Sequence, residues 1–404
     1  MTRITAIETL RLAEHPNVLW VHVESDDGAK GLGETYFMPR AVEAYIHEWA
    51  APRLIGQKLD SIERLVRTLR PYLGNRSAGV EMRGNSAIDI ALWDLMSRLD
   101  GKPLVDMLGG RMRDTLRIYN TCAGPAYMRG ATGQRSANWG LGAGGDYDDL
   151  NAFLTRAGDL AESLLDEGIT AMKIWPFDQA AEAHDGFDIA PDELRAALEP
   201  FEAIRARVGD RIDIMVEFHS LWTLPPALKI ARALAPFATY WHEDPVRTDN
   251  LSDLRRYAEA SPAPVCASET LAGVAGFRDL LETGAAGIVM PDLSWCGGLG
   301  EARKIAILAD AWRLPIAPHD CTGPVVLAAS THLGLASPNA LIQETVRAYY
   351  RGWYRDVVTA VPPIADGRIG VPDGPGLGLE LDPDLARKFT LTRQRTDKEG
   401  HQCL

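Results

Sequence analysis

Short apolar runs alternate with amphipathic, helix-like stretches through the second half of the chain. Three of these runs, RIDIMVE, ATYWHEDP and APVCASET, each carry a glutamate at or near their end, and Glu217, Glu243 and Glu269 follow one another at equal intervals of 26 residues (243 − 217 and 269 − 243). The intervening stretches PPALKIARALAP and LSDLRRYAEA have apolar residues at helical spacing. A strand, a helix and a second strand within about 25 residues are typical of βαβ units in a parallel sheet.

The same alternation continues on both sides of this region. Two strands are predicted before it, at residues 117–123 and 169–175, and three after it, which end at Asp292, His319 and Glu344. Counted from residue 117, the pattern contains eight strand and helix units. Eight such units predict an α/β fold with a modified (β/α)8 TIM barrel over residues 116–345, whose active site lies at the C-terminal ends of the strands.

The two ends of the chain follow other patterns. Residues 4–12, residues 18–24 and the segment GLGETYF alternate as strands, and residues 41–99 have helical spacing. They predict an N-terminal α+β capping domain over residues 1–115. Residues 346–404, rich in Gly and Pro, are predicted to form a C-terminal tail that packs on this cap. A Gly-rich insert over residues 124–147 has the composition of a functional or flexible loop.

Composition and charge exclude several classes of protein. The 404 residues are 46% hydrophobic and 24% charged, as in an ordinary globular protein. No apolar run approaches the roughly 18 residues of a membrane span, and charges interrupt the N-terminal apolar pattern, so neither a membrane protein nor a secretory signal is predicted. A net charge of −13 argues against nucleic-acid binding. The five cysteines show no zinc spacing, so a cytoplasmic protein with reduced thiols is expected.

The three glutamates are candidate metal ligands. In a barrel their side chains would meet at one mouth, where each pair of like charges roughly 4 Å apart costs about 4 kcal/mol at an effective dielectric constant near 20. Raised pKa values or a bound cation would relieve this repulsion. Ligation by oxygen alone suits Mg²⁺. The pattern therefore predicts a Mg²⁺ site at Glu217, Glu243 and Glu269.

The other strand ends supply candidates for acid–base chemistry. His319 is predicted to abstract the proton α to a substrate carboxylate, with Asp292 fixing its tautomer. Glu344, if protonated by the influence of nearby like charges, would hydrogen-bond that carboxylate. Lys173 would offset the excess of carboxylates or hold the substrate. His219 lies two residues after Glu217, on the same side of its strand, and is either a proton donor to a leaving hydroxyl or a loop histidine bonded to backbone.

Several further residues are interpreted as structural or left open. His242 should face away from the site, and His184 and His332 are expected to be surface or packing residues. The three tryptophans near strand ends, Trp222, Trp241 and Trp295, either line a pocket or pack in the barrel. Substrate choice is expected to depend on the loop at residues 34–40, on residues 129–139 and on residues 347–354, and the sequence does not say how.

Seven short motifs resemble those of the enolase superfamily, and within it the mandelate racemase subgroup. They are AMKIW, VEFHS, HEDP, ASET, MPDLSWCGG, APHD and QET. The resemblance covers the whole chain and implies a capped barrel in which Glu217, Glu243 and Glu269 bind Mg²⁺. It also implies that Asp292 and His319 form the catalytic dyad and that Glu344 lies at the substrate carboxylate. Members of the family commonly form dimers or octamers, so a homo-oligomer is expected.

Three positions refine the activity that the resemblance implies. Trp175 stands where the racemases carry a second lysine, which removes one of their two bases, and Glu217 stands where Asp is commoner. His219 matches the carboxylate-x-His pattern of the acid-sugar dehydratases, such as the galactonate and mannonate dehydratases. The sequence thus predicts a Mg²⁺-dependent hydro-lyase that acts on a small-molecule sugar acid through a metal-stabilised enediolate, eliminates the 3-hydroxyl and gives a 2-keto-3-deoxy acid.

Two other functions compete with this prediction. One is a racemase, epimerase or cycloisomerase that uses Lys173 as the second base. The other is a protein that binds metal and acid without turnover, acting as a sensor or scaffold.

Overall fold

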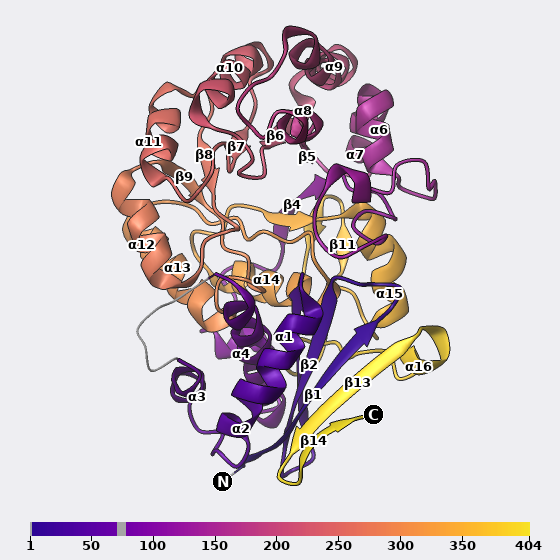
Figure 1. Cartoon of the computed structure of the whole chain (residues 1–404), viewed down its shortest axis with the longest axis vertical. Coiled ribbons are helices and arrows are strands. Elements are labelled where there is room, and N and C mark those ends of the chain that lie inside the picture. The colour runs from indigo at the N-terminus through magenta and orange to yellow at the C-terminus, as the bar shows by residue number, and fades with distance from the viewer. Residues whose placement is uncertain (1, 71–77) are drawn as a thin grey trace.

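The computed structural model describes residues 2–70 and 78–404, and shows a cap that sits against a barrel (Figure 1). The cap contains an antiparallel sheet of β1 (Ile4–Leu12), β2 (Val18–Ser25) and β3 (Lys30–Tyr36), followed by β13 (Leu391–Asp397) and β14 (Gly400–Cys403) from the other end of the chain. The strand order is β14-β13-β1-β2-β3. Both termini therefore lie in the cap (Figure 1).

Helices cover one face of this sheet. The longest, α4 (Val80–Leu99), packs directly on β3, which is possible because Gly31 and Gly33 lack side chains. A Cβ atom at Gly33 would lie 1.8 Å from the carbonyl oxygen of Ala87, and one at Gly31 would lie 2.0 Å from that of Ala91. The shorter helical elements of the cap are α1 (Pro39–Tyr45), η1 (Ile46–Ala50), α2 (Ala51–Leu54), α3 (Ile62–Thr68) and α5 (Leu104–Met107). The predicted helical region includes residues 71–77, which lie outside the described residues.

The barrel strands pair in parallel and in chain order. They are β4 (Leu116–Thr121), β5 (Ala171–Ile174), β6 (Asp213–Glu217), β7 (Trp241–Glu243), β8 (Val265–Ala267), β9 (Ala286–Val289) and β10 (Gln343–Thr345). The pairing of β10 with β4 brings the last strand back to the first. Between β9 and β10, Ile316 forms single parallel bridges to Val289 and to Ala340. The predicted seventh strand is thus an extended segment held by isolated bridges, and the predicted capped (β/α)8 fold is confirmed.

The barrel helices lie outside the strands. They are α6 (Asp149–Thr155), α7 (Ala157–Asp166), α8 (Asp178–Ala183), α9 (Pro191–Val208), α10 (Leu224–Leu234), α11 (Leu251–Ala260), α12 (Gly273–Thr283), α13 (Leu299–Ala311) and α14 (Pro324–Ala336). Proline begins α9 and α14, where its missing N–H is not needed. Helices α6 and α7 follow each other directly and are separated at Arg156, whose φ of −154° is not helical.

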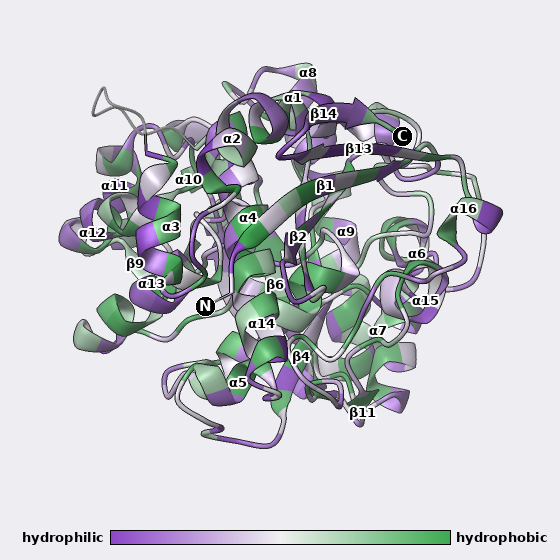
Figure 2. Cartoon of the chain, turned by 90° about the horizontal axis from the view of Figure 1, so that it is seen from below, coloured by the Kyte–Doolittle hydropathy of each residue, from purple (hydrophilic) through white to green (hydrophobic). Residues whose placement is uncertain are grey.

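Helix α14 differs from the other barrel helices because it is buried on every side along nearly its whole length. It contacts β3 and α5 of the cap as well as β4 and β10 of the barrel. Its colour in Figure 2 is accordingly hydrophobic along most of the helix, without the polar stripe of a surface helix. The interface between cap and barrel is therefore continuous with the core.

The tail divides between the two parts. The short strands β11 (Ile364–Ala365) and β12 (Arg368–Ile369) extend the barrel sheet at β4, whereas β13 pairs with β1 along seven residues. The remaining tail helices are η5 (Tyr349–Trp353), α15 (Tyr354–Val357) and α16 (Leu385–Lys388). The division into domains at residues 115 and 345 stays a prediction. Among the described residues, no helix has the length and apolarity required to traverse a membrane.

Candidate active site

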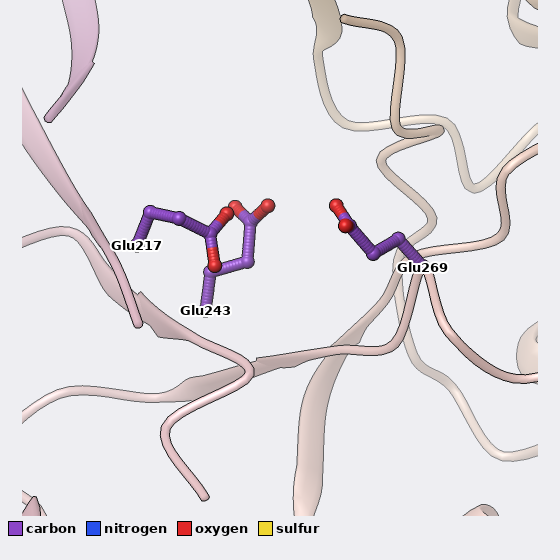
Figure 3. A group of neighbouring side chains, drawn as sticks. All are labelled: Glu217, Glu243 and Glu269. Carbon is purple, nitrogen blue, oxygen red and sulfur yellow. The ribbon is translucent and has the colours of Figure 1, made fainter. Parts of the chain in front are cut away.

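Three glutamates meet at the C-terminal ends of β6, β7 and β8. Glu217 and Glu243 are the last residues of paired neighbouring strands and stand opposite each other in register, and Glu269 lies two residues past the end of β8. One carboxylate oxygen from each lies within 4.8 Å of the others. All three side chains are buried, and their carboxylates face a shared space (Figure 3). The predicted convergence of these residues is therefore seen in the structure.

Lys173, near the end of β5, is the cation beside this cluster. Its Nζ lies 3.1 Å from Glu217 Oε2 and 3.0 Å from Glu344 Oε1, and it also contacts Glu243 Oε1. Burial opposes the charge on Lys173, but Glu243 and Glu344 outweigh it and raise the lysine pKa. Burial and the neighbouring Glu217 raise the pKa of Glu243. Burial also opposes ionisation of Glu217, yet Lys173 and His219 hold its pKa below the usual value.

His319 lies on the other side of the cluster and makes contacts with both ring nitrogens. Nδ1 is 2.7 Å from Asp292 Oδ2, and Nε2 is 2.8 Å from Glu269 Oε2. The second oxygen of Asp292 accepts hydrogen bonds of 2.6 Å from both the backbone N–H and the hydroxyl of Ser294. Burial alone would lower the pKa of His319, but Glu269 and Glu344 raise it well above the usual value. The predicted pairing of Asp292 with His319 is thus present.

Glu344 differs from the prediction in its protonation state. Its Oε1 accepts a hydrogen bond from the hydroxyl of Thr121, and its Oε2 accepts one of 2.8 Å from the N–H of Asp320. Although burial raises its pKa, Lys173 and His319 lower it below the ordinary value. The expectation of a protonated Glu344 was wrong because cations and hydrogen-bond donors, rather than the neighbouring carboxylates, dominate its surroundings. An ionised Glu344 accepts hydrogen bonds and holds Lys173.

His219 forms a second histidine–carboxylate pair. Its Nδ1 lies 2.7 Å from Oδ2 of Asp178, the first residue of α8. Its φ of +51°, followed by +55° at Ser220, is a left-handed conformation that non-glycine residues seldom adopt. Burial opposes its charge, but Asp178 and Glu217 raise the pKa of His219 to about 9. The interpretation of His219 as a loop histidine bonded only to backbone is not what the structure shows.

Both histidines line one cavity. It also reaches three of the predicted regions: the loop at residues 34–40, the insert at 124–147 and the end of β5. The lining side chains are Tyr36, Phe37, Thr121, Tyr127, Met128, Gln134, Lys173, Trp175, His219, Glu269, Trp295, His319 and Cys321. Two aromatic side chains of this lining pack against the imidazoles: Trp175 lies edge-on to His219, and Trp295 lies tilted against His319.

Several residues considered from the sequence lie outside the cavity. Arg347 is buried in an ion pair with Asp149 and Glu167 and does not line the cavity. Its chain neighbours on η5 are likewise not part of the lining. Of the three tryptophans, Trp295 lines the cavity, whereas Trp222 and Trp241 are packed in the barrel.

The three other histidines have structural contacts. His242 is buried and bonds Thr239 and Tyr257. His184 pairs with Glu193. His332 accepts a hydrogen bond from the N–H of Val105. None of the three belongs to the cavity lining.

Two family models match the chain. The model described as "Mandelate racemase / muconate lactonizing enzyme, N-terminal domain" matches residues 4–109, and "Enolase C-terminal domain-like" matches residues 156–385. The chain belongs to the enolase superfamily. The capping domain and the barrel of this enolase-superfamily chain are thus each matched by the corresponding family domain.

Curated relatives of this enolase-superfamily chain are dehydratases. It is 32% identical to a D-galactonate dehydratase of Ralstonia nicotianae over 393 residues, which are 95% of this chain and 93% of that protein. It is 30% identical to a D-xylonate dehydratase of Haloferax volcanii over 388 residues, 94% of this chain and 87% of that protein. The predicted class of enzyme, a hydro-lyase, is confirmed by this similarity along nearly the whole chain.

Solved structures agree with the assignment to the superfamily. An enolase of the mandelate racemase subgroup from Agrobacterium tumefaciens is 54% identical, with a TM-score of 0.88 and coverage of 98% of this chain and 100% of that one. An enolase protein from the environmental sequencing of the Sargasso Sea is 42% identical, with a TM-score of 0.87 and coverage of 98% and 100%. The resemblance to this superfamily and subgroup is therefore confirmed.

Sequence reasoning missed three polar residues that the structure places around the site. They are Thr121 on Glu344, Asp178 on His219 and Ser294 on Asp292. Asp178 and Ser294 follow predicted strand ends by a few residues, which is where active-site side chains of a barrel lie. That signal could have identified them as candidates, but the sequence gives no indication of which partner each one contacts.

Proposed function

We propose that the protein is a Mg²⁺-dependent dehydratase of a sugar acid, which eliminates the 3-hydroxyl to give a 2-keto-3-deoxy acid. The observation that carries the proposal is the presence of two carboxylate-paired histidines, His319 and His219, in one cavity beside a cluster of three glutamates. A β-elimination of water needs a base for the α-proton and an acid for the hydroxyl, and these two imidazoles supply one of each.

The residues present fit a divalent cation. Glu217, Glu243 and Glu269 are buried, and within the described chain Oε2 of Glu217 and Oε2 of Glu269 have ion-pair contacts with Lys173 and His319 but no hydrogen bond. Carboxylate oxygens of this kind are ligands for a hard ion such as Mg²⁺. When bound there, the ion supplies positive charge that polarises a substrate carboxylate and stabilises the negative charge that develops on it.

His319 is the proposed base. Asp292 accepts the Nδ1–H, which leaves Nε2 as the nitrogen that takes the proton from the carbon next to the carboxylate. Two hydrogen bonds from Ser294 fix the orientation of the Asp292 carboxyl group. Among the groups that raise the pKa of His319, Glu269 has the largest effect. When the Glu269 carboxylate binds a metal ion instead, the pKa of His319 falls toward the range in which an imidazole acts as a base.

His219 is the proposed acid. Its Nε2–H gives a proton to the 3-hydroxyl oxygen, the C3–O bond breaks and water leaves. The electron pair from the broken C2–H bond forms the C2=C3 bond. The resulting enol, which carries the 2-hydroxyl, tautomerises to the 2-keto-3-deoxy acid.

Lys173 holds the substrate carboxylate by charge rather than acting as a base. Three carboxylates surround its ammonium group and raise its pKa, so a neutral amine is disfavoured. Trp175, which occupies the position of the racemases' second lysine, is buried and carries no basic nitrogen. Both observations argue against the racemase alternative, in which Lys173 would have to accept a proton.

Incubation of the purified protein with a library of sugar acids in the presence of Mg²⁺ tests this function. We expect formation of a 2-keto acid from at least one member, measured colorimetrically, and its loss when EDTA removes the metal. Deuterium incorporation at C2 without any loss of water would instead support the racemase or epimerase alternative. Calorimetric binding of a sugar acid that is unaffected by His319→Ala, without turnover, would support the non-catalytic alternative.

The oligomeric state and the cytoplasmic location of the protein stay predictions. Size-exclusion chromatography with light scattering measures the first directly.

A further inference from the structure

We propose that Asp178 is the positioning residue of the acid His219, and that it holds Nδ1–H so that the Nε2–H bond points into the cavity. The proposal rests on the proposed dehydratase function, in which His219 protonates the departing hydroxyl. It adds a residue that is not part of the motifs that carry the resemblance to the superfamily. Asp178 touches the imidazole and is not part of the cavity lining, so it acts through His219.

The contact between the two residues is short and directed. Asp178 Oδ2 lies 2.7 Å from Nδ1, and in the described part of the chain no hydrogen bond engages Nε2 of His219. The left-handed backbone at His219 and Ser220 turns the chain directly after Glu217, whose Oε1 accepts the N–H groups of Phe218 and His219. Backbone strain of this kind persists where surrounding contacts enforce it, often at functional sites. The carboxylate of Asp178 fixes the ring orientation that this backbone leaves open.

The arrangement repeats the one at His319. In both pairs an aspartate that follows one barrel strand contacts Nδ1 of a histidine that follows the next strand: Asp178 after β5 with His219 after β6, and Asp292 after β9 with His319 after the Ile316 segment. Both distances are 2.7 Å. An acceptor on Nδ1 holds that nitrogen as the N–H donor and leaves Nε2 as the ring nitrogen that faces a substrate. The same construction therefore orients both imidazoles of the cavity.

A purely structural role does not explain Asp178. Its side chain is 8% exposed, and its Oδ1 has no hydrogen-bond partner among the described residues. Burial of a carboxylate with one partner is unfavourable unless that partner compensates it. Its place as the first residue of α8 adds only a modest interaction with a helix of six residues. Among the described residues, the contact with His219 is the one that compensates the burial of this carboxylate.

Separate measurement of deuterium exchange at C2 and of water loss tests the positioning role of Asp178. In Asp178→Asn we expect 2-keto acid formation to fall about 10²-fold, the lower end of a general-acid contribution. Deuterium exchange at C2, which uses His319 as the base and does not need a proton from His219, should stay within about threefold. The matched control is Asp185→Asn, in the turn after the same helix, where the side chain is 86% exposed. This variant should leave both rates unchanged.

A better leaving group provides the decisive comparison. Fluoride departs without a proton donor, so elimination from a 3-deoxy-3-fluoro analogue should proceed in Asp178→Asn within about threefold of the wild-type rate. Asp178→Glu, which keeps the carboxylate, should restore part of the water elimination. Equal losses for hydroxyl and fluoride, or loss of C2 exchange in the Asn variant, would overturn the proposal and indicate a structural role.

A readout without substrate separates this proposal from the proposed function. The Nδ1–H proton of His219, assigned by its absence in His219→Gln, should give a downfield ¹H signal that moves upfield in Asp178→Asn and stays in place in Asp185→Asn. If no sugar acid is turned over, the dehydratase function fails, while this signal still reports the Asp178 contact. An unchanged signal in Asp178→Asn would overturn the positioning role even in an active dehydratase.

Discussion

The two histidines of the cavity have the same carboxylate contact but different surroundings. At His319, both oxygens of the partner Asp292 are occupied, one by the imidazole and the other by Ser294, and Nε2 faces Glu269. At His219, one oxygen of Asp178 has no hydrogen bond and Nε2 has none either within the described chain. His219 is also the more exposed imidazole, with 14% of its side chain accessible against 7% for His319.

This difference suggests how one type of side chain can serve two roles. His319 has a fully hydrogen-bonded aspartate and sits directly beside the glutamate cluster, where the charge of an enolised carboxylate would develop. The backbone N–H of His219 donates a hydrogen bond to Glu217, at the opposite end of the cluster. The left-handed turn at His219 directs its Nε2 toward the cavity. We therefore expect removal of each histidine to stop a different step.

Replacement of the two histidines has the largest expected effect. His319→Gln should slow both C2 exchange and water loss, each by about 10³-fold to 10⁴-fold, because it removes the proposed base and the neighbouring carboxylates keep Lys173 charged. His219→Gln should slow water loss by about 10²-fold to 10³-fold and leave C2 exchange nearly intact. Deuterium incorporation followed by mass spectrometry, beside a 2-keto acid assay, distinguishes them. Loss of exchange in both variants would contradict the division of roles.

Ser294→Ala should have a smaller effect, confined to the base. It removes one of the two hydrogen bonds to Asp292 Oδ1 and keeps the backbone N–H, so about 1.5 kcal/mol is lost, or roughly tenfold in the rate of C2 exchange. Water loss falls in proportion because it follows exchange. The fluoro analogue should not rescue this variant, in contrast to Asp178→Asn. Rescue by fluoride would show that Ser294 serves the acid instead.

His332 extends the comparison to a buried histidine without a carboxylate. Burial lowers its pKa to about 4, below the ordinary 6.5, so between these values the unfolded chain binds a proton that the folded chain does not. Acidification from pH 6.5 to 4 thus destabilises the fold by up to about 1.4 kcal/mol per pH unit through this residue. His332→Asn should make the melting temperature less sensitive to pH in this window without changing turnover at neutral pH. An unchanged slope would show that His332 is protonated in the folded state.

Much of the site was predictable because barrel geometry converts sequence periodicity into spatial convergence. Equal spacing of Glu217, Glu243 and Glu269 places them at neighbouring strand ends, and parallel strands in register bring these ends together. The pairing of Asp292 with His319 follows from the same rule, since both lie at adjacent strand ends and bridge each other in parallel. Alternation along each strand then selects which side chains face the mouth.

Contacts made by loops were not predictable in this way. Asp178 reaches His219 from a helix that begins after a different strand, and Arg347 is directed to Asp149 rather than to the cavity. The protonation state of Glu344 depends on its distances to Lys173, His319 and the N–H of Asp320. These groups lower the pKa of Glu344, whereas nearby carboxylates would raise it. Local sequence contains no information on such distances.

The sequence by itself indicated the superfamily, through the resemblance of its strand-end motifs. It also determined the capped barrel and the set of side chains that end the strands, because repeated local patterns fix both. Only the tertiary structure decided which imidazole contacts which carboxylate, which wall of the cavity is aromatic and which acid stays ionised. These properties depend on the separation of groups that lie 24 to 223 residues apart in the chain, such as Asp320 and Glu344 or Thr121 and Glu344. Electrostatic and hydrogen-bond energies vary steeply with that separation, and folding alone sets it.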